Sequence, residues 1–232
     1  MKILALDTST TFGSIAISSD KTIIAEYAIK SRKTHSKTLL PSIDKMLNET
    51  GIHINEINAV VVANGPGSFT GLRIGLSTAK GICYGQKIPL IAISTLMSLA
   101  NNVTFANKNI CVVLDAGRSQ VYSAIYSSEL DELINPQLFT VEELINNIKE
   151  EVIFVGPCTD NLKNELNAGV KVYYKIAPSH LNYPRAASMI DILLKKSIKL
   201  SYDYQYIANL QPFYIRRSSA EEHYKIKNYK LK

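Results

Sequence analysis

The sequence predicts an α/β protein made of two ribonuclease-H-like lobes, of which the second is degenerate. Two observations predict this fold class. The first part of the chain shows three short strands and then alternating helices and strands, and a weaker copy of the same order begins near residue 110. A chain of 232 residues is long enough for two buried cores. Two such lobes around a cleft form the architecture shared by actin, sugar kinases and heat-shock-70 ATPases.

The first lobe is expected to begin with three strands that pair antiparallel, because the segments between them are too short for helices. Apolar residues at helical spacing then predict a helix that ends at Gly51, with Pro41 at its start or at a kink. The expected strands are 2–7, 12–18, 22–29, 59–63 and 89–93, and the expected helices are 39–47 and 68–84.

The second lobe repeats this pattern with little sequence identity. Its start, VVLDAGRS, resembles LALDTSTT near the N-terminus. We expect strands at 112–119, 120–126, 152–157 and 171–176, and helices at 141–151 and 186–199. The polar stretch at 101–108 separates the lobes, so the predicted domains are 1–103, 104–211 and a basic tail at 212–232.

Composition and charge limit the classes of function. The net charge is +6, and the last nineteen residues contribute +4 of it, so the tail is either a solvated end or a contact for nucleic acid. The sequence has no stretch of 18 uncharged apolar residues, which argues against a membrane span. Three widely spaced cysteines, Cys83, Cys111 and Cys158, fit a reducing compartment and therefore a cytoplasmic location.

The first strand ends in Asp7, Thr8 and Ser9, at the turn that faces metal and phosphates in the two-lobed ATPases. Asp7 could bind Mg²⁺ through water while the two hydroxyls donate to phosphate. Alternatively, Asp7 caps the turn by accepting hydrogen bonds from nearby N–H groups. Both readings stay open from sequence.

A glycine-rich turn, GPGSFTG at 65–71, follows the predicted strand at 59–63. It is not a Walker loop, because Leu72 stands where that motif needs lysine. The turn could still offer helix N-terminal N–H groups to an anion, or Ser68 or Thr70 could cap the helix instead. The candidate residues of this vestigial nucleotide site are Asp7, Thr8, Ser9, Gly65, Gly67, Ser68 and Thr70.

The helix after this turn carries small residues at every fourth position, Gly71, Gly75 and Ala79. Interior glycine weakens a helix, so another backbone is expected to approach it closely. That backbone belongs either to the underlying sheet or to a partner subunit. No pair of histidines has metal-ligand spacing, and Asn64 stands where a ribonuclease-H-like nuclease needs a second carboxylate, which argues against nuclease activity.

Five strings together resemble the TsaB family, also called YeaZ, over nearly the full length of the chain. They are LALDTST near the start, HSKTLLP at 35–41, GPGSFTGLRIG at 65–75, ISTLMSLA at 93–100 and PFYIRRSSAEE at 212–222. The string GPGSFTG is highly specific. Residues 104–211 match in layout more than in motif.

The resemblance implies a non-catalytic subunit of the bacterial machinery that transfers a threonylcarbamoyl group to N6 of adenosine 37 in tRNAs reading codons that begin with A. It implies three partners: a TsaD-type catalytic paralogue, a TsaE-type ATPase and tRNA within the complex. It implies a homodimer when the protein is alone and no required cofactor, with weak binding of ATP or ADP left open.

The resemblance also places the partner surface on the first-lobe helices. The expected interface residues are Leu39, Leu40, Ile43, Leu72, Gly75, Ala79 and Ile82. A bulky residue at Gly75 is therefore expected to block pairing while the lobe stays folded. The alternative function is that of an ATP-dependent small-molecule kinase or ATPase of the same fold.

Overall fold

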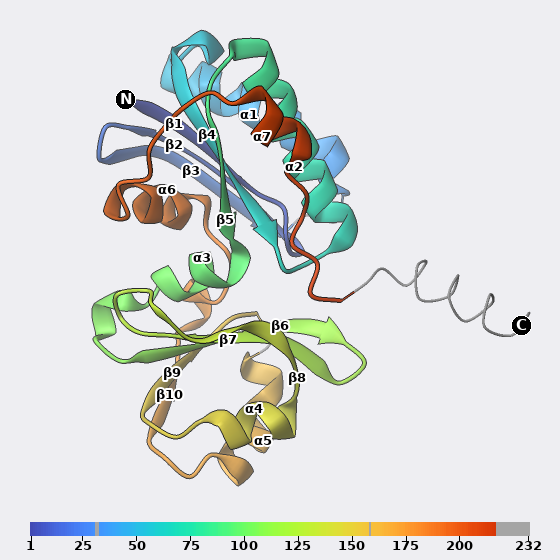
Figure 1. Cartoon of the computed structure of the whole chain (residues 1–232), viewed down its shortest axis with the longest axis vertical. Helices are drawn as coiled ribbons and strands as arrows, with labels where there is room; N and C mark the ends of the chain where they lie inside the picture. The colour runs from blue at the N-terminus through green and yellow to red at the C-terminus, as the bar shows by residue number, and fades with distance from the viewer. Residues whose placement is uncertain (31–32, 158, 217–232) are drawn as a thin grey trace, which may run out of the picture.

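The computed structural model describes residues 1–30, 33–157 and 159–216, and it contains two five-stranded sheets, one above the other (Figure 1). The first sheet has the strand order β3-β2-β1-β4-β5. Its strands are β1 (Lys2–Asp7), β2 (Phe12–Ser19), β3 (Thr22–Lys30), β4 (Ile57–Gly65) and β5 (Leu90–Ser94). The first three pair antiparallel, as the short connections predicted, and β4 and β5 extend the sheet in parallel.

Helices cover both faces of the first sheet, and the alternation of side chains along β1 shows how. Leu4 and Leu6 pack with α1 (His35–Thr50) and α2 (Phe69–Gln86) on one face. Ile3 and Ala5 pack on the other face with α3 (Thr95–Asn101) and α6 (Ala186–Lys195). Both faces are buried, which explains why β4 is a continuous apolar run.

The predicted end of the first helix is confirmed, and of the two alternatives for Pro41 the earlier helix start is the one observed. Gly51 caps α1 in the left-handed conformation at φ 66°, where glycine has no steric penalty. The helix begins at His35, so Pro41 lies inside it and not at its start.

The second sheet has the order β10-β9-β6-β7-β8, which repeats the topology of the first sheet and confirms the expectation of two similar lobes. Its strands are β6 (Asn109–Gly117), β7 (Gln120–Tyr126), β8 (Glu132–Thr140), β9 (Val152–Val155) and β10 (Tyr174–Ile176). Helices α4 (Val141–Asn147) and α5 (Lys163–Gly169) pack against each other, and α4 packs against β7 and β8. The short 3₁₀ helices are Ile54–Glu56, Thr104–Ala106, Thr159–Leu162 and Ser179–Leu181.

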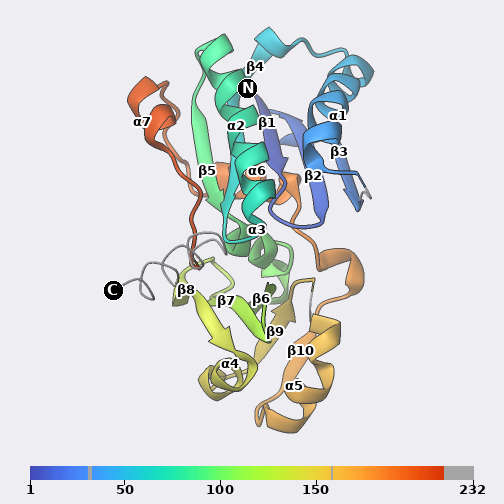
Figure 2. The same ribbon diagram turned by 90° about the vertical axis from the view of Figure 1, so that its right-hand side faces the viewer.

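The chain returns to the first sheet at its C-terminal end. Helix α6 packs on β1, β2 and β4, and α7 (Tyr204–Asn209) packs on α2 (Figure 2). Both helices fall within 104–211, so the lobe built around the first sheet draws on two separate parts of the chain. Residues 217–232 of the expected basic tail lie outside the described residues, as does Cys158.

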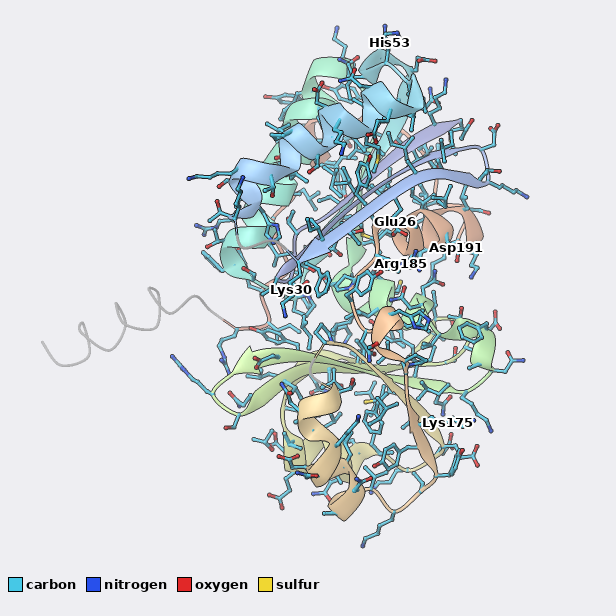
Figure 3. All side chains as sticks on the ribbon, turned by 180° about the vertical axis from the view of Figure 1, so that it is seen from behind. Glu26, Lys30, His53, Lys175, Arg185 and Asp191 are labelled. Atoms are coloured by element: carbon cyan, nitrogen blue, oxygen red, sulfur yellow. The ribbon has the colours of Figure 1, made fainter. Side chains whose placement is uncertain are left out.

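An ion pair fixes α6 to the first sheet at the junction of the lobes. Glu26 on β3 accepts hydrogen bonds from Arg185 and from the backbone N–H of Ala187, at 3.2 Å for the latter (Figure 3). The Ser14 hydroxyl accepts from the Ala186 N–H at 3.0 Å. These bonds satisfy N–H groups at the start of the helix that have no partner within it.

Two further properties concern the described part of the chain as a whole. None of its helices is both long enough and apolar enough to span a bilayer. Cys83 and Cys111 are buried in the cores, in line with their sequence interpretation as small apolar residues.

Candidate functional site

The turn after β1 is buried, and its polar atoms are engaged within the protein. The carboxylate oxygen Oδ1 of Asp7 accepts hydrogen bonds from the backbone N–H and the hydroxyl of Ser9, at 2.8 and 2.6 Å. The Thr8 hydroxyl donates to the carbonyl oxygen of Gly71 at 2.7 Å. All three residues of the turn are at most 2% exposed. The reading in which Asp7 organises its own turn therefore has direct geometric support.

The glycine-rich turn lies against this first turn at the distance of backbone contact. A Cβ on Gly67 would lie 2.3 Å from the Ser9 carbonyl oxygen, and one on Gly71 would lie 2.0 Å from the Thr8 carbonyl oxygen. The Ser68 N–H donates to the Ser9 carbonyl at 2.7 Å. The glycines are thus needed so that two chain segments can approach each other.

The other candidate residues of the glycine-rich turn are Ser68, Gly65 and Thr70. Ser68 is the N-cap of α2, and its hydroxyl accepts from the Gly71 N–H at 3.2 Å, so the capping alternative is the one observed. Gly65 is buried and joins Pro66 by a cis peptide bond, whereas Thr70 is exposed.

A cleft of about 600 Å³ lies between the two lobes. Of the candidate nucleotide residues, Ser9, Gly67 and Ser68 line it, while the other four do not. Lys30 at the end of β3 and Asp115 on β6 bring opposite charges to its walls. Within residues 1–30, 33–157 and 159–216, no three His, Cys, Asp or Glu side chains gather as metal ligands.

Asp7 has an unusual electrostatic environment. Burial raises the pKa of its carboxyl above the ordinary value, and the hydrogen bonds from Ser9 and the charge of His35 oppose this only in part. The second oxygen, Oδ2, has no hydrogen-bond partner among the described residues. Protonation of Asp7 is therefore easier in the folded protein than in the unfolded chain.

We expect Asp7→Asn to stabilise the protein at pH 8, because asparagine has the same shape but lacks the carboxylate charge that burial disfavours. A raised pKa in the folded state means that the contribution of Asp7 to stability is full below its unfolded pKa. It is lost as the pH rises through the folded pKa. The advantage of the variant should therefore shrink from pH 8 to pH 4 in urea unfolding. An advantage that stays constant with pH would contradict the raised pKa, and Asp44→Asn on the surface of α1 is the charge-matched control.

A second concave surface lies on the outside of the first lobe, where α1 and α2 run side by side (Figure 2). We call it the α1–α2 groove, and its volume is about 450 Å³. Its lining residues are Ser36, Leu39, Leu40, Phe69, Thr70, Arg73, Ile74, Ser77 and Thr78.

The groove combines apolar and polar side chains. Leu40 is 58% exposed and lies beside the partly buried Phe69 and Ile74 in the groove lining. The guanidinium of Arg73 lies 3.9 Å from the centre of the Phe69 ring in a cation–π contact. Serine and threonine residues surround these apolar groups. Apolar residues within a polar rim are typical of protein–protein interfaces.

Most of the expected interface residues are buried in the free chain, although Leu39 also lines the α1–α2 groove. Leu39, Ile43, Leu72 and Ala79 are at most 5% exposed, and Leu39, Ile43 and Ala79 belong to the core between the first sheet and its helices. Leu40 is exposed and Ile82 is half-buried, so these two remain at the surface.

The small-residue stripe faces the turn after β1. A Cβ on Gly75 already lies 2.4 Å from the Thr8 hydroxyl oxygen, so a bulky residue there would disturb the fold itself. This contact argues against the expectation that such a variant stays folded. Sequence reasoning also missed Phe69, Arg73 and Ser77, although their spacing of four residues on α2 places them on one helix face.

The family model and two of the relatives that match this chain are described by their role in forming threonylcarbamoyladenosine in tRNA. A family model described as "TsaD: tRNA N6-adenosine threonylcarbamoyltransferase" matches residues 22–224. The TsaB protein of Bacillus subtilis, described as a tRNA threonylcarbamoyladenosine biosynthesis protein, is 32% identical over 95% of this chain and 96% of its own. The Escherichia coli TsaB is 33% identical over 67% of this chain and 71% of its own.

A solved structure supports the fold. YeaZ from Pseudomonas aeruginosa superposes with a TM-score of 0.75 at 20% identity, over 92% of this chain and 99% of that chain. Together with the repeated strand order of the two sheets, this likeness confirms the predicted two-lobed, actin-like architecture.

Proposed function

Because the chain belongs to the TsaB family, we propose that it is a non-catalytic scaffold and activator subunit in the biosynthesis of threonylcarbamoyladenosine in tRNA. It pairs with a TsaD-type catalytic paralogue and helps to recruit a TsaE-type ATPase in the cytoplasm. The complex modifies N6 of adenosine 37 in tRNAs that read codons beginning with A. Alone, the subunit forms a homodimer through the same surface.

The observation that carries this proposal is the α1–α2 groove. It presents the exposed Leu40 side chain and the Phe69–Arg73 pair on a rigid helical surface. Two helices with a shared apolar core are suited to docking two helices of a paralogue with the same fold. We therefore assign the groove to the catalytic subunit.

The packing of the glycine-rich turn supports a non-catalytic role over that of a kinase. A kinase of this fold needs the turn after β1 to face the phosphates of ATP. Here the Thr8 hydroxyl is directed to Gly71, the Ser9 carbonyl accepts from Ser68, and Ser9 itself binds Asp7. The turn thus serves to hold α2 against the sheet.

Reconstitution tests the proposal. The chain is added to purified TsaD-type and TsaE-type subunits, and threonylcarbamoyl transfer to tRNA is measured. We expect transfer to require this chain and the isolated chain to show no turnover of ATP. Transfer at the same rate without the chain would overturn the scaffold role, and ATP turnover by the isolated chain would favour the kinase.

A further inference from the structure

The C-terminal end of the described chain forms a strap, residues 203–216, along α2. Helix α7 anchors its first half, because Ile207 is fully buried in the core beneath α2. The Tyr204 ring packs on Tyr84 with a distance of 5.3 Å between ring centres, and Lys80 donates to the Ala208 carbonyl at 3.0 Å. In Figure 1 the strap continues from α7 towards the second sheet.

The second half of the strap touches the α1–α2 groove. The Phe213 N–H donates to the Asn64 carbonyl at the end of β4, at 2.6 Å. The next residue, Tyr214, stacks on Phe69 with ring centres 4.5 Å apart, and its hydroxyl accepts from Nε of Arg73 at 3.1 Å. Tyr214 therefore holds the two groove side chains that form the cation–π pair.

Two residues later the strap reaches the second lobe. Nη1 of Arg216 donates to the Ala116 carbonyl at 2.6 Å, and Nη2 donates to the Gln120 side chain. These partners lie at the turn between β6 and β7, and Ala116 lines the interlobe cleft. Tyr214 is thus fixed from both sides, by Phe213 on the first lobe and by Arg216 on the second.

We propose that the C-terminal strap couples partner docking in the α1–α2 groove to the placement of the second lobe. Arg216 is a positioning residue in this scheme, because it holds Tyr214 against Phe69 and Arg73 without lining the groove. The proposal rests on the proposed function, which supplies a TsaD-type subunit as the occupant of the groove. Side chains that are ordered before binding lose less freedom on binding, so an anchored strap favours docking. The coupling is reciprocal, so docking also stabilises the contact of Arg216 with the second lobe.

The test measures binding of the TsaD-type subunit to the full chain by calorimetry. We expect Arg216→Ala to weaken binding about five-fold, the lower end of usual coupling between sites. Arg216→Lys keeps a donor for the Ala116 carbonyl and should recover most of the affinity. Lys149→Ala removes the same charge from an exposed site in the second lobe and should bind as the wild type does. Lys149→Ala should melt with the wild type because Lys149 is exposed, and Arg216→Ala should melt only about 2–4 °C lower because it loses hydrogen bonds at a half-buried site.

Hydrogen exchange of the unbound proteins provides the second measurement. The amide of Phe213 should exchange faster in Arg216→Ala than in the wild type, while the amides of α2 stay protected. Equal exchange would overturn the anchoring role of Arg216. If the wild type bound the TsaD-type subunit and Arg216→Ala bound it equally tightly, the coupling alone would be overturned. If the wild type did not bind, the proposed function itself would be overturned.

Discussion

Replacing Gly71 with alanine is expected to lower the free energy of unfolding by about 3 kcal/mol, the upper end of the usual cost of overpacking. The added Cβ would lie 2.0 Å from the Thr8 carbonyl oxygen, which is a backbone atom with little freedom to move. The Gly71 carbonyl also accepts the buried hydrogen bond from the Thr8 hydroxyl, so a shift of α2 would weaken that bond as well. Urea unfolding of the variant and the wild type measures the effect.

Gly81 on the same helix provides a matched control. A Cβ there would meet no atom within 4 Å, and the residue is exposed. Alanine favours the helix over glycine, so Gly81→Ala should raise the free energy of unfolding by up to about 1 kcal/mol. If Gly71→Ala were as stable as Gly81→Ala, the close approach of the two turns would be wrong.

The order of elements in the first lobe follows from local signals, which explains why it could be predicted. Apolar runs and helical periodicity mark β4 and α2, and Gly51 marks the end of α1.

Strand β8 was missed, because it is an edge strand whose side chains are mostly exposed and which contains Pro136. Helix α3 was missed because it starts directly after β5, with Ser94 as both the last strand residue and the N-cap.

The candidate site depended on contacts between distant segments, which sequence patterns do not contain. The glycine stripe of α2 faces Thr8, whose hydroxyl bonds a residue 63 positions away. The bond between Arg73 and Tyr214 spans 141 positions. Local periodicity shows that α1 has an apolar face, but it could not tell that Leu39 points to the core while the adjacent Leu40 points outward.

That distinction leads to the sharpest test of the docking surface, Leu40→Arg. The variant should bind the TsaD-type subunit about 30-fold more weakly, which corresponds to about 2 kcal/mol for an apolar contact at the centre of an interface. Leucine and arginine have similar helix propensities, and the Leu40 side chain is largely exposed, so the stability of the free protein should stay within about 0.5 kcal/mol. Calorimetric titration with the partner and urea unfolding of the free chain measure the two quantities.

Leu133→Arg is the control for the general effect of replacing an exposed apolar side chain with a charged one outside the groove. Leu133 lies on β8 of the second sheet and is 52% exposed, close to the exposure of Leu40. Both substitutions add the same charge to the same chain, so any difference in affinity reports the position alone. Loss of binding in both variants would point to charge repulsion, and equal binding of both would place the partner surface away from the α1–α2 groove. Loss of binding in Leu40→Arg alone would assign the groove to the catalytic subunit. Of the two positions, only Leu40 lies beside the Phe69–Arg73 pair.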